Sequence, residues 1–163
     1  MFHQTDESGS ILLTWWKELE SDKGERAVLR RASNLTDVAF SPAYHRLLSR
    51  LQQKGDAVNR EALAAVAGLV THIKVHSDSG GSLASQMASP KSGGGGARVS
   101  GLRFKRLLAV ADRNDLYPLL IRVIHLLDGT VNLLSLANAV YWWNENTRKQ
   151  WAYDYYSTAP AEK

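Results

Sequence analysis

The sequence predicts an all-α fold, a compact helical bundle of two small lobes joined by a Ser/Gly-rich loop. Apolar residues recur at intervals of three and four along most of the chain, which places them on one face of successive helices. No segment shows the apolar–polar alternation of a half-buried strand. Serine and glycine dominate a central stretch between two helical regions. We therefore expect a lobe over 1–76, a flexible connection over 77–97 and a second lobe over 98–163.

The first lobe is predicted to begin with two helices. Ser10 can cap the first, which ends where Asp22–Gly24 interrupts the pattern, and the second covers 25–32. Because residues three and four apart share a helix face, the spacing predicts which side chains are buried. These are Leu12, Trp16 and Leu19 in the first helix, with Trp15 partly off their face, and Val28, Leu29 and Ala32 in the second.

Two longer helices are predicted to complete the first lobe. Ser41-Pro42 is a strong helix start, because serine caps the first turn and proline suits the first helical position. Asn59 begins what we expect to be the longest helix, ending near His76. The apolar faces of the two helices are Tyr44, Leu47, Leu48 and Leu51, and Leu63, Val66, Val70 and Ile73.

The second lobe is predicted to hold three helices, and a short helical segment over 83–88 is expected to rest on the body of the protein. The first helix lies within Arg98–Leu108, the second runs from about Leu116 to Leu127, and the third from Asn132 to about Asn146. The expected core residues are Phe104, Leu107, Leu108 and Ala111, then Leu119, Leu120, Val123, Ile124 and Leu127, then Leu133, Leu136, Ala137 and Val140. Aromatic residues follow, and at least one of Trp142 and Trp143 should be buried.

Composition narrows the class of protein. With 163 residues, 44% of them hydrophobic, the chain can bury a substantial core without a cofactor. It has no cysteine, which excludes disulfides and thiolate zinc sites. The polar, acidic start is unlike a signal peptide, and no apolar run approaches the roughly 20 residues of a membrane span. We therefore expect a cytoplasmic protein that binds no membrane and no cofactor.

Positive charge is concentrated in the middle of the chain. Residues 1–25 hold two Lys or Arg against six Asp or Glu, residues 26–110 hold thirteen against four, and residues 111–163 hold five against six. Local excess charge attracts phosphates over about a Debye length of roughly 10 Å. The distribution therefore favours a polyanionic partner, and nucleic acid is the commonest.

Three groups of cations have few acids near them in the sequence. They lie on the second helix, on the helix that starts at Pro42, and in the stretch 98–106, where no acid occurs between Asp78 and Asp112. Phosphate contact explains these groups, and so does an ordinary solvated helix surface. Arg113 is set apart, because Asp112 and Asp115 beside it predict an ion pair. The three groups are Arg26, Arg30 and Arg31; Arg46 and Arg50; and Arg98, Arg103, Lys105 and Arg106.

Catalytic patterns are weak. His72 and His76 stand at a spacing that could present two imidazoles to one metal, but only Asp78 offers a nearby third ligand. We read the pair as polar residues at a helix end and predict no metal. The glycines at 93–96 lack the pattern of a phosphate-binding loop, and no nucleophile elbow occurs. We predict no catalytic residue, and a helical nuclease using these histidines is the last-ranked alternative.

Several residue groups follow one another in a characteristic order along the chain. They are Arg98-Val99-Ser100-Gly101-Leu102-Arg103-Phe104-Lys105-Arg106-Leu107-Leu108, Asp112-Arg113, Leu116, Val131-Asn132, Leu136-Ala137, Trp142-Trp143 and Trp151-Ala152-Tyr153-Asp154-Tyr155-Tyr156. In these residues and their order, the sequence resembles the CasB family, the small subunit of the type I-E CRISPR interference complex called Cascade. The resemblance extends over nearly the full chain, although the Ser/Gly tract before Arg98 is longer here.

The resemblance implies a helical, non-catalytic protein that packs with further copies of itself and with the other Cascade subunits. It also implies contact with the backbones of guide RNA and target DNA, so that the opened DNA cannot easily re-anneal. We expect the basic surface to consist of Arg30, Arg31, Arg46, Arg50, Lys74, Arg98, Arg103, Lys105, Arg106, Arg122, Arg148 and Lys149. The alternative is a structural assembly subunit whose basic face meets acidic protein only.

Overall fold

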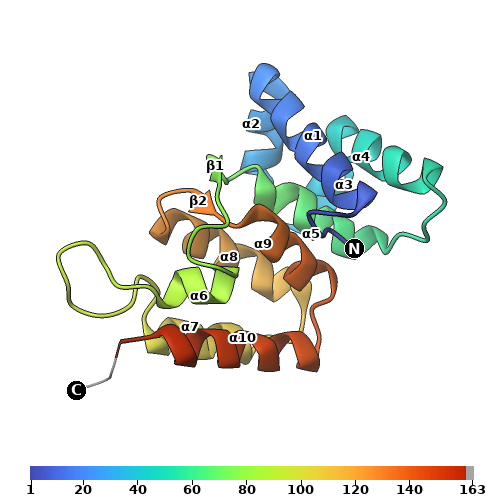
Figure 1. Ribbon diagram of the computed structural model, residues 1–163. Helices are drawn as coiled ribbons and strands as arrows, with labels where there is room; N and C mark the ends of the chain where they lie inside the picture. Colours follow the sequence, from blue (N-terminus) through green and yellow to red (C-terminus); the bar gives the residue numbers. More distant parts are fainter. Residues whose placement is uncertain (161–163) are drawn as a thin grey trace.

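Helix α5, Arg60–Val70, lies at the centre of the molecule in the computed structural model, which describes residues 1–160 (Figure 1). The Asn59 side chain caps this helix by accepting a hydrogen bond from the Ala62 backbone N–H at 3.0 Å. Every residue from 62 to 70 is buried. A helix that is apolar all round must be covered on every side, and helices α2, α3, α4, α8 and α9 provide the cover.

Four helices precede α5, of which α2, α3 and α4 pack on it and α1 packs on α2 and α4. They are α1 Glu7–Ser21, α2 Lys23–Arg31, α3 Leu35–Ala39 and α4 Pro42–Gln53. Helix α1 crosses α4, where the indole N–H of Trp15 donates to the Ala43 carbonyl at 2.9 Å. Pro42 occupies the first turn of α4, as expected from its fixed φ and missing N–H.

The second half of the chain forms α6 Leu83–Ala88, α7 Gly101–Leu108, α8 Arg113–Leu126, α9 Leu133–Tyr141 and α10 Glu145–Thr158. Helix α10 lies along α6 and α7 (Figure 1). The Phe104 ring of α7 stacks on the Tyr155 ring of α10 with centroids 3.9 Å apart. The Tyr155 hydroxyl donates to the Val99 carbonyl at 2.6 Å. Tyr155 of α10 thus contacts both α7, at Phe104, and the segment just before α7, at Val99.

Two short parallel strands join the halves of the chain. Strand β1, Val75–His76, pairs with β2, Thr130–Val131, in a register that places Val75 opposite Thr130. The Lys74 backbone N–H donates to the Gly129 carbonyl at 2.8 Å and extends the pairing by one residue. The strand pair therefore holds the end of α5 beside the end of α8.

The all-α class predicted from the sequence is confirmed, and the apolar segment 83–88 is a helix whose Leu83, Ala84, Met87 and Ala88 are buried. One buried hydrophobic cluster extends from Phe2 to Tyr155. The two lobes with boundaries at 76 and 97 stay a prediction.

Several predicted helix boundaries are wrong. The helix expected to end near His76 stops at Val70, because the chain turns there and enters β1. This helix, α5, was expected to be the longest, but with 11 residues it is shorter than α1 with 15. The helix expected over 132–146 is two helices. Asn144 begins the second by accepting a hydrogen bond from the Thr147 N–H at 2.9 Å. Helix α3 was not expected, since five residues are too few to show a periodic pattern.

Three predicted burial states are also wrong. Val28 is 51% exposed, because the short helix α2 buries only Leu29 along its length. Ala111 is exposed, because α7 ends at Leu108 and the chain leaves the core. Trp15 is fully buried, because its indole N–H finds the Ala43 carbonyl.

We expect Gly68→Ala to destabilise the protein by about 1–3 kcal/mol. A Cβ atom at position 68 would lie 2.3 Å from the Tyr117 hydroxyl and 2.8 Å from a Val38 methyl group, both in tightly packed surroundings. Urea unfolding followed by circular dichroism measures the change. Gly24→Ala is the matched control in α2, where no atom lies closer than 3.7 Å. It should be neutral or stabilising by up to about 1 kcal/mol. Equal stability of the two variants would contradict this packing.

Candidate nucleic-acid interface

Helices α7 and α8 enclose a shallow groove that carries three arginines. Helix α7 contributes residues at positions i, i+3 and i+4, and α8 contributes residues at i, i+3, i+4 and i+7, so each set forms one helix face. The groove has a volume of about 80 Å³. We call it the arginine groove, and it is lined by Arg103, Arg106, Leu107, Leu119, Arg122, Val123 and Leu126.

The guanidinium groups of this groove are exposed and have no anionic partner. Among residues 1–160, Arg103, Arg106 and Arg122 form no ion pair and their side chains form no hydrogen bond. Helix α7 contains no acidic residue, and no Asp or Glu lines the groove. Lys105 is exposed on the same helix and forms no ion pair with any residue from 1 to 160. Three uncompensated charges around one concavity attract anions more strongly than scattered charges do.

Arg98 lies at one end of the arginine groove. Its Nη2 is 3.2 Å from an Asp128 carboxylate oxygen and 3.5 Å from the carbonyl oxygen of Leu126, a residue that lines the groove. The Asp128 side chain is 89% exposed, so this ion pair is strongly screened by solvent. Arg98 is therefore near the three groove arginines, but part of its charge is already compensated.

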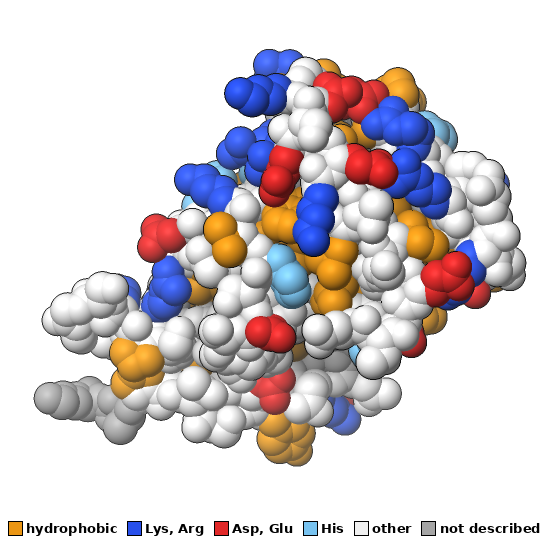
Figure 2. All heavy atoms as spheres, turned by 45° about the horizontal axis from the view of Figure 1, so that its top comes forward, with side chains coloured by type: hydrophobic (Ala, Val, Ile, Leu, Met, Phe, Trp, Pro, Cys, Tyr) orange, Lys and Arg blue, Asp and Glu red, His pale blue; other side chains and the backbone are white. Residues whose placement is uncertain are grey.

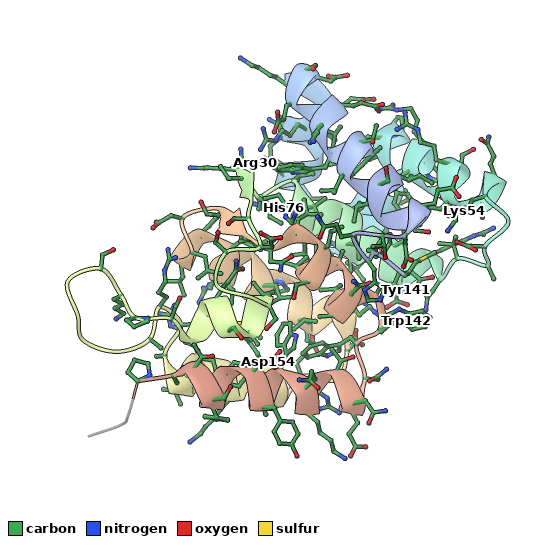
Figure 3. The ribbon with its side chains drawn as sticks, in the orientation of Figure 1. Arg30, Lys54, His76, Tyr141, Trp142 and Asp154 are labelled. Carbon is green, nitrogen blue, oxygen red and sulfur yellow. The ribbon has the colours of Figure 1, made fainter. Side chains whose placement is uncertain are left out.

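Cations of helix α2 approach the same end of α8. Arg26 donates to the Ile73 carbonyl at 3.4 Å, and Arg30 projects from α2 on the side of the strand pair (Figure 3). Lys74 follows Ile73, and its side chain lies over Gly129, just beyond α8. Arg30, Arg31 and Lys74 are exposed and make no ion pair within residues 1–160. Figure 2 shows Lys and Arg side chains along the margin of the molecule from α2 towards the Ser/Gly-rich loop.

A buried histidine lies beneath this line of cations. The His72 ring is 7% exposed, neither of its nitrogens has a hydrogen-bond partner in residues 1–160, and its centroid is 5.6 Å from that of His125. Burial, which is the largest cause, and the positive charges of Arg30, His125 and Arg26 together lower the pKa of His72 to about 4. His72 is therefore neutral at physiological pH and adds no charge to the surface.

Four of the twelve predicted cations are paired with carboxylates, and two of these pairs contradict the expectation drawn from local sequence. Arg46 binds both carboxylate oxygens of Glu25, and Arg50 lies 2.8 Å from Glu18. The Glu25 contact raises the pKa of Arg46 and lowers that of Glu25. The acids come from α1 and α2, which pack against α4 although they are distant in sequence.

The remaining predicted cations lie on α10. Lys149 is 3.3 Å from Glu145, one helical turn before it, and both side chains are largely exposed. Arg148 donates to the Leu108 carbonyl at 3.1 Å and fastens α10 to the end of α7. The structure thus brings Arg98, Arg103, Arg106 and Arg122 together at one groove. The charges of Arg46, Arg50 and Lys149 are compensated by carboxylates, and Arg148 is held by a backbone carbonyl.

Arg113 does not form the ion pair expected with its neighbours. Its guanidinium donates to the Val140 carbonyl at 2.9 Å and to the Tyr141 carbonyl at 2.7 Å, at the end of α9. Asp112 instead caps α8 by accepting a hydrogen bond from the Asn114 N–H at 2.7 Å. Arg113 is therefore a structural residue that satisfies the last carbonyls of a helix.

The two histidines at metal-binding spacing do not share a helix. His72 lies in the turn after α5, and His76 lies in β1, where its Nδ1 accepts a hydrogen bond from the Leu133 N–H at 3.0 Å. Within residues 1–160, no group of three or more His, Cys, Asp and Glu side chains could hold a metal ion. The geometry that would favour the nuclease alternative is not formed by these residues.

The aromatic residues of the C-terminal part divide between core and surface. Trp143 and Trp151 are buried and contact each other edge to face, with ring centroids 4.9 Å apart. The expectation that at least one of Trp142 and Trp143 is buried is thus confirmed by Trp143. Trp142, Tyr153 and Tyr156 are exposed to 53%, 73% and 50%.

No helix among residues 1–160 is long and apolar enough to cross a membrane.

A family model for the CRISPR-associated protein Cse2 matches residues 25–156. The chain belongs to the Cse2 family. CasB is a second name for Cse2, so the resemblance noted in the sequence is confirmed. No curated protein sequence matches the chain significantly.

A solved structure supports the Cse2 fold independently. The chain is similar to one chain in the crystal structure of E. coli Cascade bound to a PAM-containing dsDNA target, with a TM-score of 0.73 and 23% sequence identity. The similarity covers 93% of this chain and 95% of that chain. The two proteins therefore share one fold over almost their whole length.

Sequence reasoning missed the apolar floor of the arginine groove in this Cse2-family protein. Leu119 and Val123 were expected in the core, and Leu126 was not considered. Leu126 is 36% exposed, while Val123 is 3% exposed, so the apolar face of α8 extends from the core to the surface. The signal was present as the spacing of Leu119, Arg122, Val123 and Leu126, which places an arginine within an apolar stripe.

We expect the free energy of unfolding to fall as pH decreases from about 6.5 to about 4, partly because of His72. The folded-state pKa of about 4 lies below the ordinary value, so the unfolded chain binds a proton in this range that the folded protein does not. The contribution is at most roughly 3 kcal/mol. Urea unfolding at pH 7, 6 and 5 measures it against His72→Phe, whose curve should be flatter. Parallel curves for the two proteins would contradict a neutral His72.

Proposed function

We propose that the protein is a non-catalytic small subunit of the type I-E CRISPR RNA-guided complex. In this role it braces guide RNA and target DNA and holds the displaced DNA strand, together with the other Cascade subunits and further copies of itself. Membership of the Cse2 family and the fold shared with a chain of DNA-bound E. coli Cascade support this role.

The single observation that carries the nucleic-acid part of the proposal is the arginine groove. Arg103, Arg106 and Arg122 are exposed around one concavity and have no acid among residues 1–160 to compensate them. Guanidinium groups bind phosphates with two donors each, and such contacts do not depend on base sequence. The exchange of a DNA duplex for an RNA–DNA heteroduplex is nearly balanced, so modest backbone contacts can favour the open state.

The twelve predicted cations have different weights in this proposal. The first rank consists of the unpaired residues Arg30, Arg31, Lys74, Arg103, Lys105, Arg106 and Arg122, and Arg98 joins them at the end of the groove. Arg46, Arg50, Arg148 and Lys149 rank lower, because a carboxylate or a backbone carbonyl already holds each of them. Exposed ion pairs are worth about 0–1 kcal/mol, but a paired site has little net charge to attract a phosphate.

A second candidate function is a structural assembly subunit that contacts protein only. Phe40 is 78% exposed at the turn between α3 and α4, near a groove of about 540 Å³ lined in part by Leu35, Ala39 and Leu48. An exposed aromatic residue beside a partly apolar groove is typical of protein contacts. The two grooves share no lining residue, so the two functions predict different sensitive residues.

We expect Arg103→Gln with Arg106→Gln to weaken strand opening by the assembled complex and to reduce its dependence on salt. Each lost phosphate contact lowers the slope of log K against log salt by about 0.7–0.9. The double variant should therefore lower the slope by about 1.4–1.8 for each copy of the subunit that contacts nucleic acid. Permanganate reactivity of the opened DNA at several salt concentrations measures this change.

The matched control is Arg46→Gln with Arg50→Gln, which removes the same charge from residues held in ion pairs. Its slope should stay near that of the unchanged protein. Circular dichroism and copurification of the complex verify folding and assembly of both variants. If both double variants reduce the slope equally, the total positive charge of the protein determines the salt dependence, and the arginine groove has no special role. If neither does, the protein-only function is favoured.

A further inference from the structure

The arginine groove is an apolar surface enclosed by cations, and this combination is more specific than a phosphate-binding surface requires. Phosphates are hydrophilic, so arginines alone suffice to bind a nucleic-acid backbone. Here Leu107, Leu119, Val123 and Leu126 line the groove together with the three arginines, and Leu119 and Leu126 are the more exposed of these apolar residues. An occupant that uses the whole groove must present an apolar face and negative charge within one small unit.

A nucleotide of a single strand has this chemistry, but a base pair within a duplex does not. In a duplex the bases are stacked and their faces are covered, while in a single strand each base can turn outward and expose a flat face. A guanidinium group can then bind the neighbouring phosphate or stack on the base. The groove is small, with a volume of about 80 Å³, so its occupant must be a small unit.

An acidic amphipathic helix fits the groove less well. Helices that dock into grooves insert several apolar side chains at i, i+3, i+4 and i+7. The arginine groove, with a volume of about 80 Å³, is too small to hold such a row of side chains. Both occupants carry the negative charge that the arginines attract, so the size of the groove is what favours a nucleotide.

We propose that the arginine groove is a subsite for one unpaired nucleotide, with the base on the apolar floor and the flanking phosphates on Arg103, Arg106 and Arg122. This inference rests on the proposed function and sharpens it, because it selects single-stranded nucleic acid over duplex at this place. It also gives Leu119 and Leu126 a role in binding that their hydrophobic character alone does not indicate.

The test compares oligothymidine with an abasic oligonucleotide of the same length and charge. Fluorescence anisotropy with the full chain at fixed salt should give a roughly five- to tenfold higher affinity for oligothymidine, because only it can bury a base. Equal affinities would overturn the subsite and leave phosphate binding intact. Failure of both oligonucleotides to bind would also overturn the subsite, and strand opening by the assembled complex then tests the proposed function separately.

The sharpest variant is Leu126→Gln, with Leu102→Gln as its matched control. Leu126 is 36% exposed at the end of α8 and Leu102 is 63% exposed on α7 outside the groove, so neither change opens the core. Leu126→Gln should weaken oligothymidine binding several-fold and leave abasic binding unchanged, whereas Leu102→Gln should change neither. An equal loss for both oligonucleotides, or no loss, would overturn the proposal.

A third arm tests a protein occupant. A leucine-containing oligoglutamate peptide competes with labelled oligothymidine for the full chain. We expect it to compete no better than free oligoglutamate of the same charge, because the groove does not hold a row of leucine side chains. Strong competition that Leu126→Gln abolishes, together with equal affinity for the two oligonucleotides, would show that the groove binds an acidic protein segment and would overturn the nucleotide subsite.

Discussion

Helix α5 is stable only when it is surrounded, because it carries no charged side chain after Glu61. Residues 62–70 are all buried, and five helices from both halves of the chain cover them. Burial of apolar surface at about 25 cal/mol per Å² is the dominant favourable term in folding, so this cover determines where α2 and α8 must lie. The cations of α2 lie near the end of α8 because both helices pack on α5.

Charge compensation separates the basic residues more clearly than their number does. Helices α1 and α2 supply Glu18 and Glu25 to the arginines of α4, whereas α7 and α8 supply no acid to their own groove. The exposed arginines of α4 therefore have acidic neighbours, whereas those of α7 and α8 that line the groove do not. Within residues 1–160, the arginine groove and the line of cations from α2 past the strand pair are therefore two places where several exposed cations without an acidic partner lie near one another.

The sequence contained enough to predict the fold class, most helix positions and the Cse2 family, because these depend on local periodicity and on ordered residue patterns. It could not show that Arg46 meets Glu25, or that Arg113 binds the carbonyls of Val140 and Tyr141, since those contacts join helices distant along the chain. The apolar floor of the groove was hidden for a related reason. Leu126 looks like an ordinary helix residue until α7 is placed beside it.

The segment before α7 has a practical consequence for measurement. Gly93–Gly96 all have positive φ, and the chain returns on itself where Pro90 pairs with Ala97, so the tip stands away from the core. The exposed residue Ser92 lies in this tip, and Arg98 connects its base to the end of α8. Because the natural sequence has no thiol at all, a cysteine placed at Ser92 would carry one dye at a known point. Energy transfer from that dye would report how far a labelled strand passes from this side of the molecule.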